Sequence, residues 1–302
     1  KNSNFCAIIP TGEPFILFRY ASLLSKQFDI PWIADYRDGW SRNYSSLEGG
    51  SRLQKWINEN IFSSIERKLI STASFCTFTV ESHRNEVQEI LPSVKTEIVM
   101  NGYFEELFTS LPETEYSAKP FRIAYSGTIY PYQQLEIFLS GLQTLITEKN
   151  LTPEDLEVVF YGLDYQPEQF QRVLNYSESL KPFIKTTARI PLKDMILELN
   201  KANAFLLLAT SSRQQVYAKV FDYIALKKPI LLCTSDNGPL EQLVNETPSP
   251  CVANSDSEVA SSIWKLMSSE LGSKEENSSL SEQYSRRNQA KKMAGLILSL
   301  TE

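Results

Sequence analysis

Short apolar runs alternate with longer amphipathic stretches along nearly the whole chain, and this alternation limits the fold more than any other feature. Runs of this kind, bounded by polar or turn-forming residues, are typical of strands buried on both faces of a parallel sheet. Strands are expected over residues 5–9, 31–35, 75–80, 96–100, 121–127, 156–162, 182–186, 203–209, 229–234 and 248–254. Helices are expected over residues 13–28, 50–72, 82–90, 131–148, 166–177, 191–200, 215–227, 238–246 and 255–270.

The strands and helices fall into two series, separated by the polar, proline-bearing stretch 109–120. Two such series predict an α/β protein with two Rossmann-like, doubly wound parallel-sheet domains facing across a cleft. We expect a partial N-terminal domain over 1–116, because its first strand opens almost at the first residue. A second domain over 117–284 follows, and then a C-terminal helix over 285–302 that packs back toward the first domain. In such sheets, ligands bind outside the carboxyl ends of the strands.

Composition excludes several classes of protein. The 302 residues carry a net charge of −6, which disfavours non-specific binding to nucleic acid. No apolar run reaches the roughly 18 residues of a membrane span, and no signal-peptide pattern opens the chain. The four cysteines lack C-x-x-C spacing, which favours free thiols and a cytoplasmic location.

Charged residues follow the strand expected over 31–35 in the first domain. Asp35, Arg37 and Asp38 lie at its carboxyl end, where two interpretations are open. The three side chains could form a structural ion-pair network, or a carboxylate could face a hydroxyl acceptor while Arg37 orients its neighbours. Trp40 offers a flat apolar surface for a sugar ring, or else a side chain for the core.

His83 is the only histidine in the chain and sits at an expected helix start, where Ser82 is the expected N-cap. A helix N-terminus disfavours imidazolium, so His83 suits a neutral donor or acceptor role, unless it is an ordinary surface histidine. With one histidine and scattered cysteines, no metal site is expected. Asn101, followed by Gly102, marks a tight turn after the strand expected over 96–100.

In the second domain, Gly127 ends the first strand and Thr128 follows it, and the glycine lets another group come close to the backbone. The dinucleotide fingerprint G-x-G-x-x-G and the P-loop motif are both absent, which disfavours a redox or P-loop enzyme.

The stretch 214–232 runs from a polar loop through a helical pattern into an apolar strand. Free N–H groups at the start of the helix expected over 215–227, with Arg213 and Lys219 nearby, predict an anion site. As a helical pair, Lys219 and Asp222 have the weaker orientation, with the cation nearer the N-terminus. A bound diphosphate would resolve that misfit, and Asp222 could accept hydrogen bonds from a ribose.

Five segments, taken together and in order, resemble the family-4-type glycosyltransferases of the GT-B fold. They are PWIADYRDGW at 31–40, IVMNGYFEELF at 98–108, FRIAYSGTIY at 121–130, ARIPLKDMILELNKANAFLLL at 188–208, and residues 214–232, which match the Glu-x7-Glu region of that family. Asp222 stands at the second acid of that motif, and Gln214 replaces the first, so an amide would meet the donor sugar. The Arg and Lys that usually follow the first strand of the donor domain are also replaced.

The resemblance implies roles for individual residues. Asp222 would contact the ribose of the donor, amides near Val216 and Tyr217 would hold its diphosphate, and the backbone at Arg189 and Ile190 would meet its base. The complete expected donor site is Gly127, Thr128, Arg189, Ile190, Arg213, Gln214, Val216, Tyr217, Lys219 and Asp222. On the other domain, the expected catalytic residues are Asp35, Asp38 and His83, with Arg37, Trp40 and Asn101 on the acceptor side.

The function implied is retaining transfer of a sugar from a nucleotide-diphosphate sugar to a hydroxyl acceptor, in surface polysaccharide or glycolipid assembly. The donor would be a co-substrate, with no cofactor and no metal required. A glycan or lipid-linked acceptor and peripheral association with the inner face of the membrane are the expected partners. Two alternatives stay open: a non-catalytic nucleotide-sugar-binding or scaffold protein, and a nucleotide-sugar epimerase of the same architecture.

Overall fold

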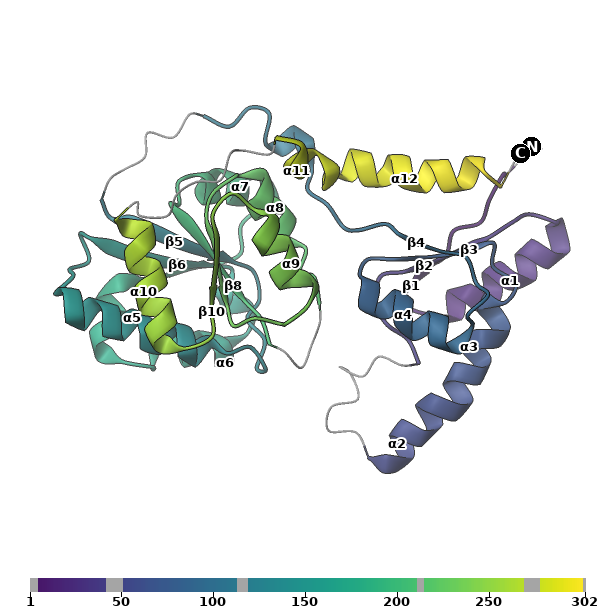
Figure 1. Cartoon of the computed structure of the whole chain (residues 1–302), viewed down its shortest axis with the longest axis horizontal. Coiled ribbons are helices and arrows are strands. Elements are labelled where there is room, and N and C mark those ends of the chain that lie inside the picture. Colours follow the sequence, from purple (N-terminus) through teal and green to yellow (C-terminus); the bar gives the residue numbers. More distant parts are fainter. Residues whose placement is uncertain (1–4, 42–50, 113–118, 211–214, 269–277, 301–302) are drawn as a thin grey trace. The chain divides into compact units, whose positions relative to one another are not determined.

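The computed structural model describes residues 5–41, 51–112, 119–210, 215–268 and 278–300. The chain divides into two compact units, one formed by Lys1–Asn101 with Arg286–Glu302 and the other by Gly102–Ser285. Each unit is built on a parallel sheet with helical connections (Figure 1), which confirms the predicted α/β class with two Rossmann-like domains.

The first unit holds a parallel sheet of strand order β1-β2-β3-β4. Its strands are β1 (Thr11–Gly12), β2 (Ile33–Tyr36), β3 (Phe75–Phe78) and β4 (Thr96–Ile98). Its helices are α1 (Ile16–Phe28), α2 (Arg52–Ile57), the π-helical turn η2 (Asn58–Phe62), α3 (Ser63–Ile70), α4 (Glu81–Ile90) and α12 (Arg286–Leu298). The last of these joins the unit from the far end of the sequence, and the N–H of Met100 donates to Gln289 Oε1 at 2.9 Å.

Aromatic side chains form the core of the first unit. Phe18, Trp32, Tyr36 and Phe78 are fully buried, and the rings of Tyr36 and Phe78 stack with centroids 5.0 Å apart. Aromatic pairs of this kind add stability beyond the area they bury. This aromatic core therefore fixes the positions of the strands β1 to β3 and of their carboxyl ends.

The second unit holds a parallel sheet of strand order β10-β9-β8-β5-β6-β7. Its strands are β5 (Phe121–Ser126), β6 (Leu156–Tyr161), β7 (Ile184–Thr187), β8 (Ala204–Leu208), β9 (Ile230–Cys233) and β10 (Pro250–Ala253). Its helices are η3 (Glu105–Leu107), α5 (Leu135–Lys149), η4 (Leu163–Tyr165), α6 (Pro167–Leu174), η5 (Glu178–Phe183), α7 (Leu192–Asn200), α8 (Lys219–Ala225), α9 (Pro239–Glu246), α10 (Asp256–Met267) and α11 (Ser278–Gln283).

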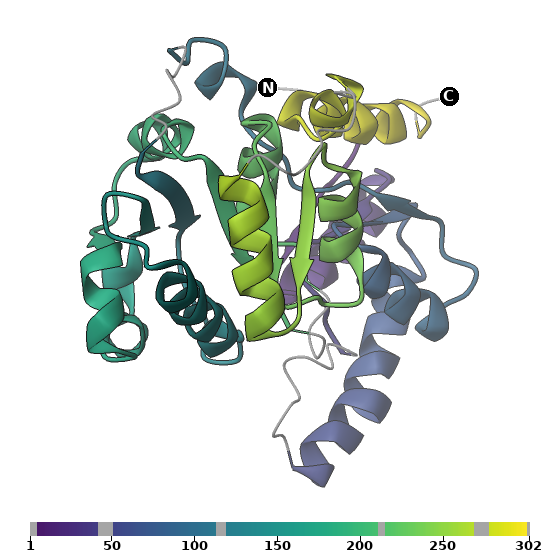
Figure 2. The same cartoon turned by 60° about the vertical axis from the view of Figure 1, so that its left-hand side comes forward.

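Helices α5 and α10 pack together over one face of this sheet, as Figure 2 shows with α10 in yellow-green. Their contact requires glycine at 141, because a Cβ there would lie 2.5 Å from both the backbone oxygen of Asp256 and the Cβ of Val259. Apolar residues from both helices and from the strands merge into one core beneath them. This core fixes the strand ends from which the connecting loops emerge.

Three sequence predictions about local structure were wrong. Residues 5–9 do not form a strand: Ile8 makes one isolated bridge to Trp32, and the strand proper is the short β1. Pro10 lies between them and has no N–H to donate to a ladder. The single helix expected over 50–72 is divided by the π-helical turn η2. The helix expected over 215–227 begins only at Lys219.

Candidate functional site

The order of the second sheet reverses between two neighbouring strands, β5 and β8. From β5 the chain continues to β6 and β7 on one side, and from β8 to β9 and β10 on the other. The connections at such a reversal diverge and leave room at the carboxyl ends of the two strands. The loops that follow β5 and β8 are therefore the first place to look for a ligand site.

Gly127 and Thr128 leave β5 in a fixed path. Gly127 has a φ of 86°, which side chains disfavour, and its N–H donates to the carbonyl oxygen of Tyr161 at 2.9 Å. The hydroxyl of Tyr125 donates to the carbonyl oxygen of Thr128 at 2.7 Å. Burial raises the pKa of Tyr125 well above its usual value, so the phenol keeps the proton that it donates.

Lys219 reaches this loop from the first residue of α8. Its ammonium nitrogen lies 3.7 Å from the centroid of the Tyr125 ring, and a Cβ added at Gly127 would be 3.7 Å from the same atom. Burial lowers the pKa of Lys219 to about 7. Among the described residues no carboxylate pairs with it. The result is a half-buried cation beside the half-buried Gly127 and Thr128, which an incoming anion would stabilise.

Arg189 brings a second cation to the same loop from the segment after β7. Its Nη2 atom lies 3.4 Å from Thr128 Oγ1, and its guanidinium lies 3.7 Å above the ring of Tyr165. Gly162, with a φ of 77°, allows this approach, because a Cβ there would be only 3.2 Å from Arg189 Cγ. Arg189 thus contacts Thr128, and Lys219 lies near the adjacent Gly127.

The start of α8 differs from the expectation. Val216 and Tyr217 precede the helix, so their amides are not at its N-terminus, although the N–H of Val220 donates to the Tyr217 carbonyl at 3.0 Å. Asp222 lies in the first turn of α8, half-buried and one turn from Lys219. Arg213 and Gln214 lie outside the described residues, and Ile190 is half-buried beside Arg189.

Tyr223 ties α8 to β5. Its hydroxyl accepts from the N–H of Ser126 at 2.9 Å, and its ring stacks on Phe205 of β8 with centroids 4.3 Å apart. Burial raises its pKa, so the hydroxyl remains protonated. This contact holds α8 against both strands of the reversal and thereby sets the position of Lys219.

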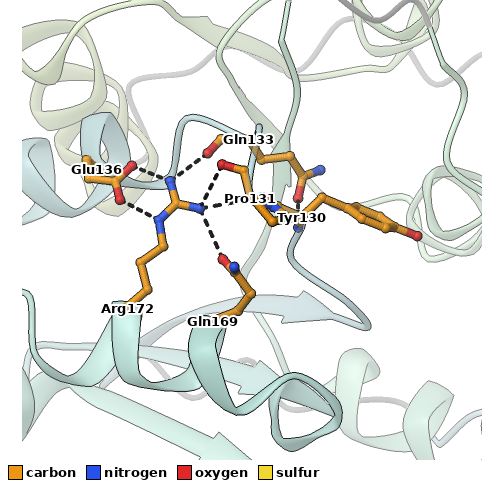
Figure 3. A network of polar contacts seen from close by, with 6 residues as sticks. All are labelled: Tyr130, Pro131, Gln133, Glu136, Gln169 and Arg172. Carbon is orange, nitrogen blue, oxygen red and sulfur yellow. Dashed lines mark hydrogen bonds and ion pairs between the residues drawn. The ribbon is translucent and has the colours of Figure 1, made fainter. Parts of the chain in front are cut away.

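The loop between β5 and α5 is held by an arginine that the sequence analysis did not single out. Figure 3 shows Arg172 of α6 pointing into this loop, with hydrogen bonds to the carbonyl oxygens of Gln133 at 2.8 Å and of Tyr130 and Pro131 at 3.4 Å. Two further contacts pair its guanidinium with both carboxylate oxygens of Glu136. The hydrogen bond from Arg172 lowers the pKa of Glu136, which strengthens the pair near neutral pH.

Gln133 continues the network into the sheet. Its side chain accepts from the N–H of Tyr130 at 2.9 Å and donates to the carbonyl oxygen of Leu208 at 2.7 Å (Figure 3 shows the first of these). The loop presents two stacked tyrosines, Tyr130 and Tyr132, with ring centroids 5.3 Å apart. The pattern of residues 166–177 predicted a helix but gave no sign that the charge of Arg172 faces this loop.

In the first unit, Asp35 is at the centre of a hydrogen-bond network. Its carboxylate accepts from Thr77 Oγ1 at 2.8 Å, from Arg37 Nε at 2.9 Å and from Thr11 Oγ1 at 3.1 Å. Arg37 also reaches Asn101 Oδ1 at 3.4 Å. Of the two interpretations of this segment, the geometry favours the ion-pair network for Asp35, because three donors already occupy the carboxylate. Asp38 is exposed and outside that network.

Trp40 packs as a core residue, since its ring stacks on Phe15 with centroids 4.9 Å apart.

His83 is buried in the first turn of α4, and its Nδ1 atom has no partner among the described residues. Burial lowers the pKa of His83, while the charge of Asp38 opposes that shift, so the imidazole is neutral at pH 7. The expected N-cap was wrong: Val80, not Ser82, occupies that position and makes no side-chain cap.

Within the described part of the chain, no group of three His, Cys, Asp or Glu residues is arranged around a metal position. No helix of that part is long and apolar enough to cross a bilayer.

No family model matches the sequence, and no curated protein matches it. Solved structures do match. The α,α-trehalose 6-phosphate synthase of Burkholderia multivorans superposes with a TM-score of 0.71 at 10% identity, over 98% of this chain and 70% of that one. The N-terminal domain of Candida albicans trehalose-6-phosphate phosphatase gives 0.68 at 13% identity, over 98% and 70%.

Anabaena HepE in complex with UDP and glucose gives a TM-score of 0.65 at 13% identity, over 98% of this chain and 78% of that one. At identities this low, the superpositions show the fold, and the activity has to be argued from the residues of this chain. The fold is GT-B, with two Rossmann-like domains.

Proposed function

We propose that the chain is a glycosyltransferase that binds a nucleotide-diphosphate sugar at the carboxyl edge of the second sheet and transfers the sugar, with retention, to a hydroxyl acceptor. The observation that carries the proposal is the placement of Lys219, a desolvated cation beside the backbone of Gly127, at the reversal of the strand order. Nucleotides bind at this place in doubly wound sheets, and a diphosphate supplies the missing anion.

The charge balance of sugar transfer explains why the cation matters. The bond between the anomeric carbon and the diphosphate oxygen breaks, a bond to the acceptor oxygen forms, and the acceptor hydroxyl loses its proton. One negative charge therefore develops on the departing diphosphate. An ammonium already fixed beside the loop stabilises that charge without rearranging, which is how preorganised sites accelerate such steps. The second cation, Arg189, supports the same group or the base beside it.

Further assignments follow the family resemblance and the geometry together. Asp222, one turn beyond Lys219, is proposed to accept hydrogen bonds from the donor ribose. In the first unit, the neutral imidazole of His83 and the exposed Asp38, which is outside the Asp35 network, are proposed as the catalytic groups that the resemblance implies. Asp35 is a positioning residue for Arg37. A glycan or lipid-linked molecule in surface polysaccharide or glycolipid assembly is the proposed acceptor.

The choice of nucleotide is tested first. HepE was solved with UDP-glucose, so UDP heads a panel that also holds GDP and ADP. A ligand present at 100 times its Kd and bound only by the folded state stabilises that state by about 2.7 kcal/mol, which thermal melting resolves. We expect one nucleotide diphosphate to raise the melting temperature of the whole chain. If none does, the donor site is wrong.

Transfer is measured next with the sugar conjugate of the preferred nucleotide and a panel of hydroxyl acceptors. Release of free nucleotide with formation of a glycosylated acceptor supports the enzyme. Stable binding of the donor without transfer to any acceptor would instead support the non-catalytic binding protein. Asp222→Ala should weaken nucleotide binding about ten- to hundredfold, since a charged hydrogen bond is worth roughly 1.5–3 kcal/mol. Unchanged affinity in this variant would refute the ribose contact.

A further inference from the structure

Two tyrosines of the β5–α5 loop form a flat aromatic surface on the second unit. The rings of Tyr130 and Tyr132 stack with their centroids 5.3 Å apart and their planes within 9° of parallel. Tyr130 is 38% exposed and Tyr132 is half-buried. Tyrosine offers a large, rigid contact area at a low cost in conformational entropy, so an exposed pair of this kind suits ligand binding.

The main chain that carries the pair is fixed by buried contacts. Arg172 donates to the carbonyl oxygens of Tyr130 and Pro131 from one side (Figure 3). The amide of Gln133, which is 2% exposed, accepts from the N–H of Tyr130 and donates to the carbonyl oxygen of Leu208 at the end of β8. Side chains on a loop held in this way have their geometry before a ligand arrives, which is a property of binding sites.

The tyrosine pair lies on the β8 side of β5, close to Lys219. The hydroxyl oxygen of Tyr132 is 3.5 Å from Oε1 of Gln215, which precedes α8. Burial, and after it the neighbouring phenols, Tyr130 and Tyr132 among them, raise the pKa of Tyr125. Both phenols are therefore near the ring over which the Lys219 ammonium lies. The pair thus borders the place where the diphosphate is proposed to bind.

The opposite side of that place carries a charged stack. Arg189 follows β7 and Tyr165 follows β6, and both strands lie on the other side of β5 from β8. A nucleotide-diphosphate sugar has its nucleoside at one end of the diphosphate and its sugar at the other. With the diphosphate at Gly127 and Lys219, one end points to each side. The guanidinium stack suits a nucleobase, because bases stack on such planes. The neutral tyrosine rings are then left for the sugar.

We propose that the Tyr130–Tyr132 pair binds the sugar ring of the donor and favours an uncharged sugar. This inference rests on the proposed function, because it requires a nucleotide-diphosphate sugar in the site. The C–H groups on one face of a pyranose carry slight positive charge and pack on the electron-rich face of an aromatic ring. A uronate would bring its carboxylate toward the same electron-rich faces, which repel an anion.

Calorimetric titration of the full chain without acceptor tests the proposal. UDP is compared with UDP-glucose, or GDP with GDP-mannose if GDP is the preferred nucleotide, and the ratio of the two Kd values measures what the sugar adds to binding. In the double variant Tyr130→Ala with Tyr132→Ala, we expect this ratio to shift by about three- to tenfold against the sugar conjugate. The Kd of the bare nucleotide should stay within about twofold of the parent value.

Two control variants separate the ring faces from other effects. Tyr132→Phe keeps the ring and removes the hydroxyl, so the ratio should stay close to that of the parent. A loss as large as that of the double variant would assign binding to the hydroxyl and overturn the stacking. Tyr165→Ala removes an exposed tyrosine from the opposite side, so it should weaken both ligands equally and leave the ratio unchanged. Thermal melting checks that each variant is folded.

The outcomes distinguish this inference from the proposed function. If the parent binds nucleotide and the double variant leaves the ratio unchanged, the tyrosines do not bind the donor sugar, while the donor site stands. If no nucleotide diphosphate binds the parent, the donor site is wrong and this inference fails with it. The choice of sugar is tested with UDP-glucuronate or GDP-mannuronate. The uronate conjugate should lose less affinity than the neutral conjugate in the double variant, and an equal or larger loss would contradict the preference for an uncharged sugar.

Discussion

The ammonium of Lys219 lies 3.7 Å above the ring of Tyr125, and the hydroxyl of the same tyrosine donates a hydrogen bond to the carbonyl oxygen of Thr128. A neutral ring stabilises a cation through its quadrupole, but much less than water or a carboxylate does. The half-buried lysine thus has only a weak partner for its charge. It is poised to exchange that environment for an anionic ligand.

Replacing Lys219 by methionine should separate stability from binding. Without ligand, Lys219→Met should raise the free energy of unfolding at pH 7 by about 1–2 kcal/mol, because a poorly solvated charge is removed. The affinity for the preferred nucleotide diphosphate should fall at least tenfold. Thermal melting and calorimetric titration measure the two effects. Lys265→Met, at an exposed lysine on α10, should change neither. A variant that melts earlier but binds normally would contradict the assignment.

The same lysine predicts two opposite pH dependences. Its pKa in the folded protein is about 7, well below the ordinary value of 10.5, so the unfolded chain binds more protons between these values. Stability of the free protein should therefore rise as pH increases from 7 toward 10.5. Nucleotide affinity should fall as pH rises above 7, because the ammonium loses its proton. Titrations between pH 7 and 9 test this, and Lys219→Arg should make the affinity nearly constant, since arginine stays charged.

Arg189 should affect binding without affecting stability. Its guanidinium stacks on the exposed Tyr165 and contacts Thr128 at 3.4 Å, and such exposed contacts add little to folding. Arg189→Gln should weaken nucleotide binding about five- to tenfold and leave the melting temperature within about 1 °C of the parent. Tyr165→Ala should give a smaller loss in the same direction. If Arg189→Gln changes only the melting temperature, the residue has a purely structural role.

Arg172 should matter for the stability of the fold. It reaches three carbonyl oxygens of the β5–α5 loop and both oxygens of Glu136. Arg172→Ala should cost about 1–3 kcal/mol of stability, because it leaves loop carbonyls and a carboxylate without their donor. Lysine keeps the positive charge but lacks the several N–H donors of a guanidinium. Arg172→Lys should therefore retain only part of the stability that Arg172→Ala loses. Chemical denaturation measures the loss, and equal stability of all three proteins would exclude the role.

His83 should destabilise the protein in acid. Burial lowers its pKa below the ordinary 6.5, so the unfolded chain binds the proton more readily. Its contribution to stability is complete above pH 6.5 and decreases as pH falls below that value. We therefore compare the free energy of unfolding of His83→Gln with that of the parent at two pH values. The difference should shift in favour of the variant on going from pH 8 to below pH 6. In the transfer assay the same variant should lower turnover with nucleotide affinity unchanged, whereas a parallel loss of both would argue against a specific catalytic contact.

The sequence predicted the architecture well, because continuous apolar runs such as 156–162 and 203–209 admit few alternatives to buried parallel strands. It also placed Gly127 and Lys219, which follow strands of the second series, in one expected donor site. It did not predict the start of α8: apolar spacing from Val216 onward fits a helix, but residues 215–217 stay outside one. Periodicity records which face is buried and not where hydrogen bonding begins.

Contacts that depend on three-dimensional approach were beyond the sequence. The arginine at 172 looked like an ordinary residue of an exposed helix, because nothing in its neighbours shows that α6 places it against residues 130–133. Trp40 illustrates the converse. A tryptophan after a strand suits either a sugar platform or a core, and only its stacking on Phe15 shows that it packs as core.

The hydrogen bonds from Arg172 to the β5–α5 loop have a consequence for substitutions in that loop. The arginine binds main-chain oxygens of Tyr130, Pro131 and Gln133, which every amino acid possesses. The tyrosines of the loop can therefore be exchanged for other side chains while the path of the backbone persists. Single substitutions at Tyr130 or Tyr132 should therefore change the surface that this loop presents and leave its main-chain path unchanged.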